Sequence, residues 1–124
     1  MKFERFVETW GTVIVVQVVS NSLNETELGL AVDKVEEFFY KVDRDFSTYK
    51  SGSEVSRIRR GELEVADASD DVKEIWKLCE YARELTLGAF DPWTVEGGFD
   101  PSGLVKGWAA EVAAKMLVGA GIAA

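Results

Sequence analysis

TVIVVQVVSNSLNETELGLAVDKVEEFFYKVDRD, residues 12–45, decides the fold because a strand pattern runs directly into a helix pattern. The β-branched run Thr12–Val19 favours a strand that is buried on both faces. Asn24 is a good helix N-cap, and Glu27 stands three residues on as its capping-box partner. Apolar residues then recur at helical spacing and predict an amphipathic helix over Glu25–Asp45. These residues are Leu28, Ala31, Val32, Val35, Phe38, Phe39, Val42 and Phe46.

The segment after this helix carries few apolar residues. Phe46–Arg60 (FSTYKSGSEVSRIRR) is rich in hydroxyl groups and predicts a loop with one helical turn at Glu54–Ile58. Glu62–Ala66 predicts a short second strand. A strand buried on both faces needs neighbouring strands, and Thr12–Val19 has only Glu62–Ala66 as a predicted neighbour. We therefore expect the sheet to be incomplete within this chain.

Two more helices are predicted, each from a cap and an apolar face. Ser69 caps the first, and Gly88 ends it. Its apolar face is Val72, Ile75, Trp76, Cys79 and Ala82. Ser102 caps the second, which Gly119 and Gly121 break. Its apolar face is Leu104, Val105, Trp108, Ala109, Val112, Ala113, Met116 and Leu117. The expected fold class is therefore α+β, a sheet with packed amphipathic helices.

Length and composition exclude several functions. A chain of 124 residues and 13.7 kDa predicts one domain. A net charge of −8 argues against nucleic acid or an anionic membrane surface as the main partner. The absence of His and the single Cys79 exclude His-dependent triads, imidazole metal sites and an internal disulfide. No apolar run is long enough to span a bilayer, and no signal peptide is evident, so the expected compartment is the cytoplasm.

Gly88–Gly107 is the segment with the clearest chemical potential. Two copies of Phe-Asp-Pro supply Asp91 and Asp100, and the second copy leads into a helix start with Lys106 close behind. Carboxylates accept hydrogen bonds from ribose or base N–H groups, while a helix N-terminus and an ammonium group meet a diphosphate. This combination suits a nucleotide. The alternative is that both Asp residues are ordinary turn and capping residues.

A second polar cluster comprises Ser47-Thr48-Tyr49 and Ser53-Glu54. Its hydroxyls and its one aromatic ring can line an adenine or flavin pocket. The alternative is a surface loop whose hydroxyl groups cap its own backbone, with Ser53 capping a short helical turn. The residue pattern by itself favours the surface loop.

Four ordered motifs resemble the ApbE family, the FAD:protein FMN transferases. They are TWGT (Thr9–Thr12), DRDFSTYKSGSEVSRIR (Asp43–Arg59), LGAFDP (Leu87–Pro92) and FDPSGLVKGWAAEVAAKML (Phe99–Leu117). The resemblance implies an enzyme that binds FAD with Mg²⁺ and splits its diphosphate. It then attaches FMN through a phosphoester to a Thr or Ser of a target flavoprotein.

The resemblance also implies site residues by motif position. Trp10 stands where the family usually has a flavin-contacting Met, and Gly103 stands at a metal position, where it can offer only its carbonyl oxygen. The implied cofactor-binding residues are Trp10, Tyr49, Ala89, Phe90, Asp91, Asp100 and Lys106. Asp91, Asp100 and Lys106 are also the residues that the local chemistry selects.

Members of the family continue into a Gly-Gly-Asp strand and a distal Asp/Thr metal site, which this sequence lacks. We therefore expect residues 1–124 to be one ApbE-like domain, incomplete at its C-terminus, that does not transfer FMN by itself. Two other functions stay open: a non-catalytic flavin- or nucleotide-binding module, and an acidic interaction domain without a ligand. A homodimer also stays open.

Overall fold

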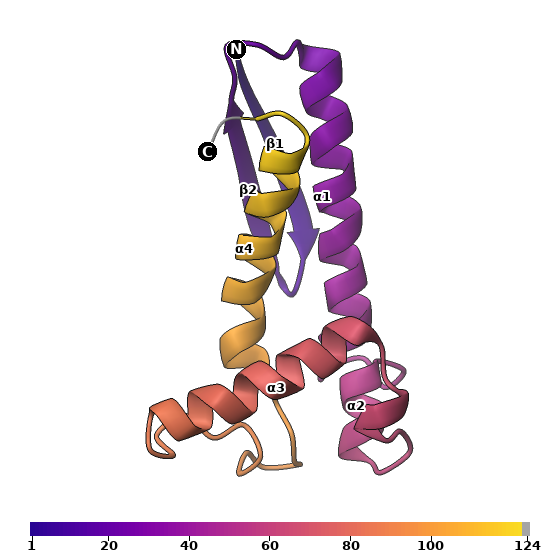
Figure 1. Cartoon of the computed structure of the whole chain (residues 1–124). Coiled ribbons are helices and arrows are strands. Elements are labelled where there is room, and N and C mark those ends of the chain that lie inside the picture. Colours follow the sequence, from indigo (N-terminus) through magenta and orange to yellow (C-terminus); the bar gives the residue numbers. More distant parts are fainter. Residues whose placement is uncertain (123–124) are drawn as a thin grey trace. The chain divides into compact units, whose positions relative to one another are not determined.

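The computed structural model describes residues 1–122 and has an α+β architecture (Figure 1). Its elements are β1 (Lys2–Thr9), β2 (Thr12–Val19), α1 (Glu25–Phe46), α2 (Glu54–Arg59), the 3₁₀ helix η1 (Val65–Asp67), α3 (Asp70–Leu85) and α4 (Ser102–Gly119). The chain forms two compact units, Met1–Asp43 with Trp108–Ala124, and Arg44–Gly107. The expectation of one domain over residues 1–124 stays a prediction, and its last two residues lie outside the described ones.

The first unit begins with an antiparallel hairpin. β1 pairs with β2 from Lys2 opposite Val19 to Thr9 opposite Thr12. The turn consists of Trp10 and Gly11, whose φ angles of 57° and 69° are both positive, as in the tight turns that match strand twist. The predicted bounds of β2 are confirmed, whereas β1 was not predicted.

The hairpin has one buried face, so the prediction that β2 is buried on both faces is wrong. Val16 and Val18 are buried, while Val13 and Val15 keep 51% and 46% of their surface exposed. Phe6 pairs opposite Val15 and is 63% exposed. Successive side chains alternate between faces, and the β-branched residues here reflect a preference for pleated backbone as much as burial.

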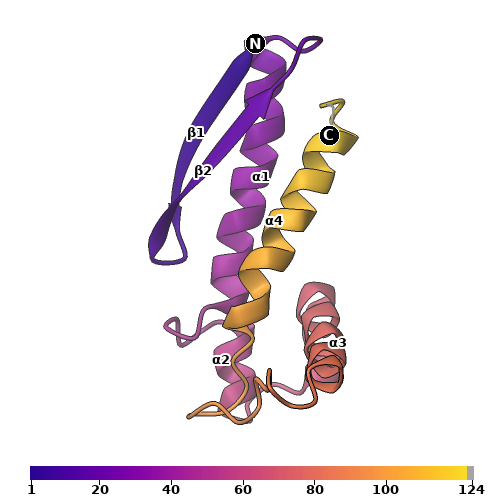
Figure 2. The ribbon, with the colours of Figure 1, turned by 90° about the vertical axis from the view of Figure 1, so that its left-hand side faces the viewer.

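Helix α1 matches its prediction closely. The Asn24 side chain accepts a hydrogen bond from the Glu27 amide at 2.9 Å, and the Glu27 carboxylate accepts one from the Asn24 amide at 3.2 Å. Figure 2 shows the hairpin running alongside the helix. Arg5 of β1 forms an ion pair with Asp33 of α1. The buried stripe of α1 is Leu28, Val32, Val35, Phe39, Val42 and Phe46.

The second unit is built from α2, α3 and the loops around them. The Ser53 hydroxyl accepts from the Ser56 amide at 3.0 Å, and the Ser69 hydroxyl accepts from the Val72 amide at 3.4 Å, so both predicted caps are confirmed. The Glu54 carboxylate accepts from the Ser69 amide at 3.0 Å and links the starts of the two helices. Its core includes Val55, Val72, Ile75, Cys79 and Phe99.

The predicted strand at Glu62–Ala66 is wrong. Val65–Asp67 forms the short helix η1, in which the Asp67 amide donates to the Glu64 carbonyl at 2.9 Å and the Ala68 amide to the Val65 carbonyl at 3.1 Å. These local bonds satisfy the backbone without a neighbouring strand.

Helix α4 starts at Ser102, but the capping group belongs to Asp100. The Asp100 Oδ1 atom accepts from the Ser102 amide at 3.0 Å, and the Pro101 carbonyl accepts from the Leu104 amide at 2.9 Å. The prediction that Ser102 caps the helix is therefore wrong by two residues. None of the helices formed by residues 1–122 has the length and apolar content to cross a membrane.

Candidate functional site

The predicted site residues of the second unit lie on the loop that follows α3 and on the elements that contact it. Thr86 organises the start of this loop, since its Oγ1 donates to the Ala82 carbonyl at 2.8 Å and accepts from the Phe90 amide at 3.0 Å. Gly88 turns the chain with a φ of 85°. Ala89 and Phe90 follow directly, Ala89 exposed and Phe90 half-buried.

The two Phe-Asp-Pro copies are joined by their backbones. The Asp100 amide donates to the Pro92 carbonyl at 2.9 Å, and both Pro92 and Pro101 are fully buried. The Asp91 carboxylate accepts from the Trp93 amide at 3.1 Å and closes a local turn. The structure therefore brings the two predicted carboxylates onto one loop that is fixed at its base.

An aromatic cluster lies under this loop. Trp76 contacts Phe99 with ring centroids 4.6 Å apart, and Trp93 stacks on Phe99 at 5.6 Å. The Arg83 guanidinium lies 4.5 Å from the Trp93 ring. The Trp93 Nε1 atom is buried without a hydrogen-bond partner. Trp93 is thus part of the packing that supports the loop.

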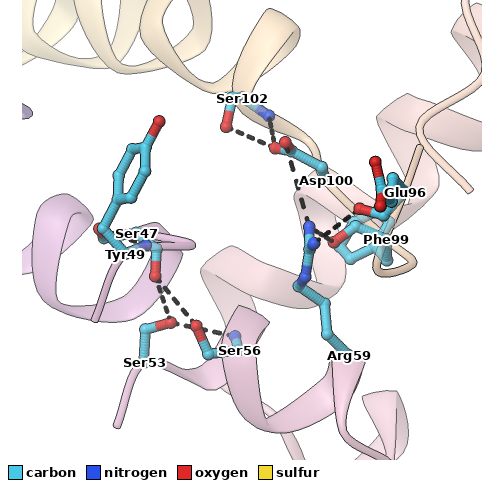
Figure 3. Close-up of polar contacts among 9 residues, drawn as sticks. All are labelled: Ser47, Tyr49, Ser53, Ser56, Arg59, Glu96, Phe99, Asp100 and Ser102. Atoms are coloured by element: carbon cyan, nitrogen blue, oxygen red, sulfur yellow. Dashed lines mark hydrogen bonds and ion pairs between the residues drawn. The ribbon is translucent and has the colours of Figure 1, made fainter. Parts of the chain in front are cut away.

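Arg59, at the end of α2, is the site residue that sequence reasoning missed. Its Nη1 donates to the Phe99 carbonyl at 3.2 Å and its Nη2 to the Glu96 carbonyl at 3.0 Å (Figure 3). The same Nη1 lies 4.0 Å from Asp100 Oδ2. A single Arg on a short helix gives no sequence signal, and its acceptors lie 37 and 40 positions further along the chain.

A hollow of about 270 Å³ opens beside Arg59. It is lined by Thr48, Tyr49, Ser51, Ser56, Arg59, Arg60 and Gly97. The Tyr49 side chain is almost fully exposed, at 99%, so its ring can stack on a ligand. Arg60 hydrogen-bonds Glu62 at 2.8 Å, and this bond lowers the pKa of the Glu62 carboxyl.

Part of the predicted hydroxyl cluster serves its own backbone. The Ser53 hydroxyl donates to the Ser47 carbonyl at 2.6 Å, and the Ser56 hydroxyl donates to the same oxygen at 3.2 Å (Figure 3). These contacts match the alternative interpretation of the cluster, a surface loop whose hydroxyl groups cap its own backbone. The Tyr49 ring therefore stays exposed, while Ser53 and Ser56 fix the loop that carries it.

Lys106 and Gly103 lie in the first turns of α4, and both are exposed. The Phe90 ring approaches Gly103 closely, since a Cβ atom added there would lie 3.4 Å from it. Trp10 belongs to the hairpin turn of the other unit, where its Nε1 donates to the Phe39 carbonyl at 3.0 Å.

The described residues do not form a metal centre by themselves. Residues 1–122 contain no group of three or more Asp, Glu, Cys or His side chains that could hold a metal ion. Gly103 is the second residue of α4, and a carbonyl at that position accepts the helical hydrogen bond from four residues on. One oxygen of Asp100 is engaged by Ser102. By themselves, the described residues therefore do not make a complete Mg²⁺ site.

Comparison with known proteins gives one family and one fold. The sequence profile described as the ApbE family matches residues 10–97, well over half of the chain. No curated protein is similar enough in sequence to match.

Solved structures share the fold at low identity. A mutant form of the flavin transferase ApbE from Vibrio cholerae superimposes with a TM-score of 0.82 at 19% identity, over 98% of this chain and 58% of that one. The same transferase without that change gives 0.81 at 19%, over 98% and 55%. The ApbE protein from Thermotoga maritima gives 0.81 at 18%, over 97% and 53%. This chain thus spans little more than half the length of these structures.

Proposed function

This chain belongs to the ApbE family, and from this premise we propose that it supplies the FAD-binding part of an FAD:protein FMN transferase. The complete reaction transfers FMN from FAD to a Thr or Ser of a target flavoprotein. The observation that carries the proposal is the loop on which Asp91 and Asp100 are held together by the Asp100–Pro92 backbone hydrogen bond. Both the local chemistry of its residues and the family motif indicate this loop as the binding site, and the two arguments are independent.

Each residue has a role that suits its chemistry. Tyr49 stacks on a ring of FAD, and Trp10 is the flavin-contacting residue by motif position. Asp91 and Asp100 accept hydrogen bonds from ribose or base N–H groups, with Ala89 and Phe90 along the cofactor. The start of α4 and Lys106 meet the diphosphate, because backbone N–H groups and an ammonium group favour negative charge there.

We propose Mg²⁺ dependence from the family alone, because Gly103 and the carboxylates of the described residues do not form a site for it. Mg²⁺ is commonly held by one or two carboxylates together with substrate phosphates. The described residues alone therefore do not supply its full set of protein ligands. We place the activity in the cytoplasm.

FAD titration tests this proposal. Isothermal titration or quenching of flavin fluorescence is expected to show saturable binding of FAD, weaker binding of FMN and the weakest binding of riboflavin, because each loses part of the diphosphate or nucleotide. Equal affinity for the three flavins would contradict a site built around the diphosphate. No binding at all would favour an interaction domain without a ligand.

A further inference from the structure

Arg59 holds the loop of residues 96–100 at three points. The guanidinium donates to two carbonyls three residues apart, those of Glu96 and Phe99, 37 and 40 positions along the chain. Its side chain is only 19% exposed. Charge-assisted bonds to main-chain carbonyls are stronger than neutral ones, and the planar fork reaches both acceptors at once.

Gly97 makes this contact possible. A Cβ atom added to Gly97 would overlap Arg59 Nη2 and lie 3.3 Å from Cζ. Gly98 also has a positive φ, 100° against 87°, yet an added Cβ there meets nothing within 4 Å. The two glycines share the backbone requirement, and only Gly97 also leaves room for the guanidinium.

Asp100 is held between Arg59 and α4. Its Oδ1 accepts from the Ser102 amide and hydroxyl, and its Oδ2 lies 4.0 Å from Arg59 Nη1 (Figure 3). The carboxylate therefore has one oxygen fixed by the start of the helix and the other directed by the guanidinium. Moving Arg59 releases both the loop and this second oxygen.

We propose that Arg59 is a positioning residue that sets the orientation of Asp100 and of the loop for a flavin nucleotide, with Gly97 as the gap that admits it. This rests on the proposed function, in which Asp100 contacts FAD. Arg59 acts through Asp100 and needs no contact with the ligand.

The test compares Gly97→Ala with Gly98→Ala. Both changes strain a positive-φ position, but only Gly97→Ala displaces Arg59. The Kd for FAD is expected to rise roughly tenfold in Gly97→Ala and in Arg59→Ala, the scale on which residues that hold a binding group in place act. Gly98→Ala is expected to change it less than about twofold. The double variant Arg59→Ala with Gly97→Ala is expected to bind FAD as tightly as Arg59→Ala alone, because both changes remove the same contact between Arg59 and the loop.

Two outcomes separate the hypotheses. If the unmodified chain binds FAD and Gly97→Ala binds it as tightly as Gly98→Ala does, the positioning role of Arg59 is overturned while the proposed function stands. If the unmodified chain binds no FAD, the proposed function and the positioning role of Arg59 are both overturned. Arg59→Lys gives a further readout: one ammonium cannot replace the fork, so its affinity is expected to follow Arg59→Ala.

Discussion

The indole Nε1–H of Trp10 donates a hydrogen bond to the main-chain carbonyl of Phe39, 3.0 Å away, and the two rings meet edge to face at 5.1 Å. The hairpin turn is thereby tied to the C-terminal half of α1. Trp10, which stands at the flavin-contacting position of the family motif, thus also anchors β1 and β2 to α1.

Replacing Trp10 by Phe separates these two roles. Trp10→Phe keeps an aromatic ring and removes the N–H donor, so the free energy of unfolding is expected to fall by about 1 kcal/mol. Urea denaturation measures it. Trp10→Ala, which also removes the ring, is the comparison and is expected to lose more. A Trp10→Phe variant as stable as the original chain would show that the hydrogen bond contributes nothing.

Neighbouring valines of β2 test the one-sided hairpin. Val16 is 8% exposed and Val15 is 46% exposed. Val16→Ala is expected to lower the free energy of unfolding by about 2 kcal/mol through lost burial and a cavity, and Val15→Ala by less than about 1 kcal/mol. Thermal or urea denaturation of the pair decides the matter. Equal losses would mean that both faces of the strand are buried in solution.

Lys106 is expected to contribute to FAD affinity through its charge. Lys106→Ala should raise the Kd for FAD by roughly tenfold to a hundredfold, as expected for one lost charge-assisted bond to phosphate. Lys115→Ala is the matched control, because Lys115 is exposed on the same helix and its ammonium group pairs with Glu111 at 3.4 Å. An unchanged Kd in Lys106→Ala removes this residue from the binding site.

Burial raises the pKa of the Cys79 thiol from 9.0 to about 11. Between about pH 9 and pH 11 the unfolded chain has lost this proton and the folded chain retains it, so stability falls as pH rises through that window. The difference in urea stability between the original chain and Cys79→Ala is expected to shrink across that range. Cys79 is also expected to resist alkylation and lipid attachment until the chain is unfolded, which mass spectrometry detects.

Incubated with FAD, Mg²⁺ and a flavoprotein carrying an acceptor Thr, the 124-residue chain is expected to give no covalent flavin. Phosphoryl transfer depends on positioning and on neutralising the charge that develops on the diphosphate, and the described residues form no metal centre for this. Flavin fluorescence on a denaturing gel is the measurement. A fluorescent, Mg²⁺-dependent acceptor band would place sufficient metal ligands within this chain.

The sequence by itself determined the helices and most of their ends. These features join residues three or four positions apart, so a local stretch of sequence is enough to predict them. They are the Asn24–Glu27 capping box, the Ser53 and Ser69 caps and the apolar stripe of α1. The tertiary structure decided the rest. It left Val13 and Val15 exposed, because a β-branched run does not specify which face of the strand is packed. It made Val65–Asp67 a 3₁₀ helix, because no strand formed by residues 1–122 pairs with this segment. It also joined Arg59 to the Phe99 carbonyl, 40 positions away, because such a contact depends on the path of the whole intervening chain rather than on any local pattern.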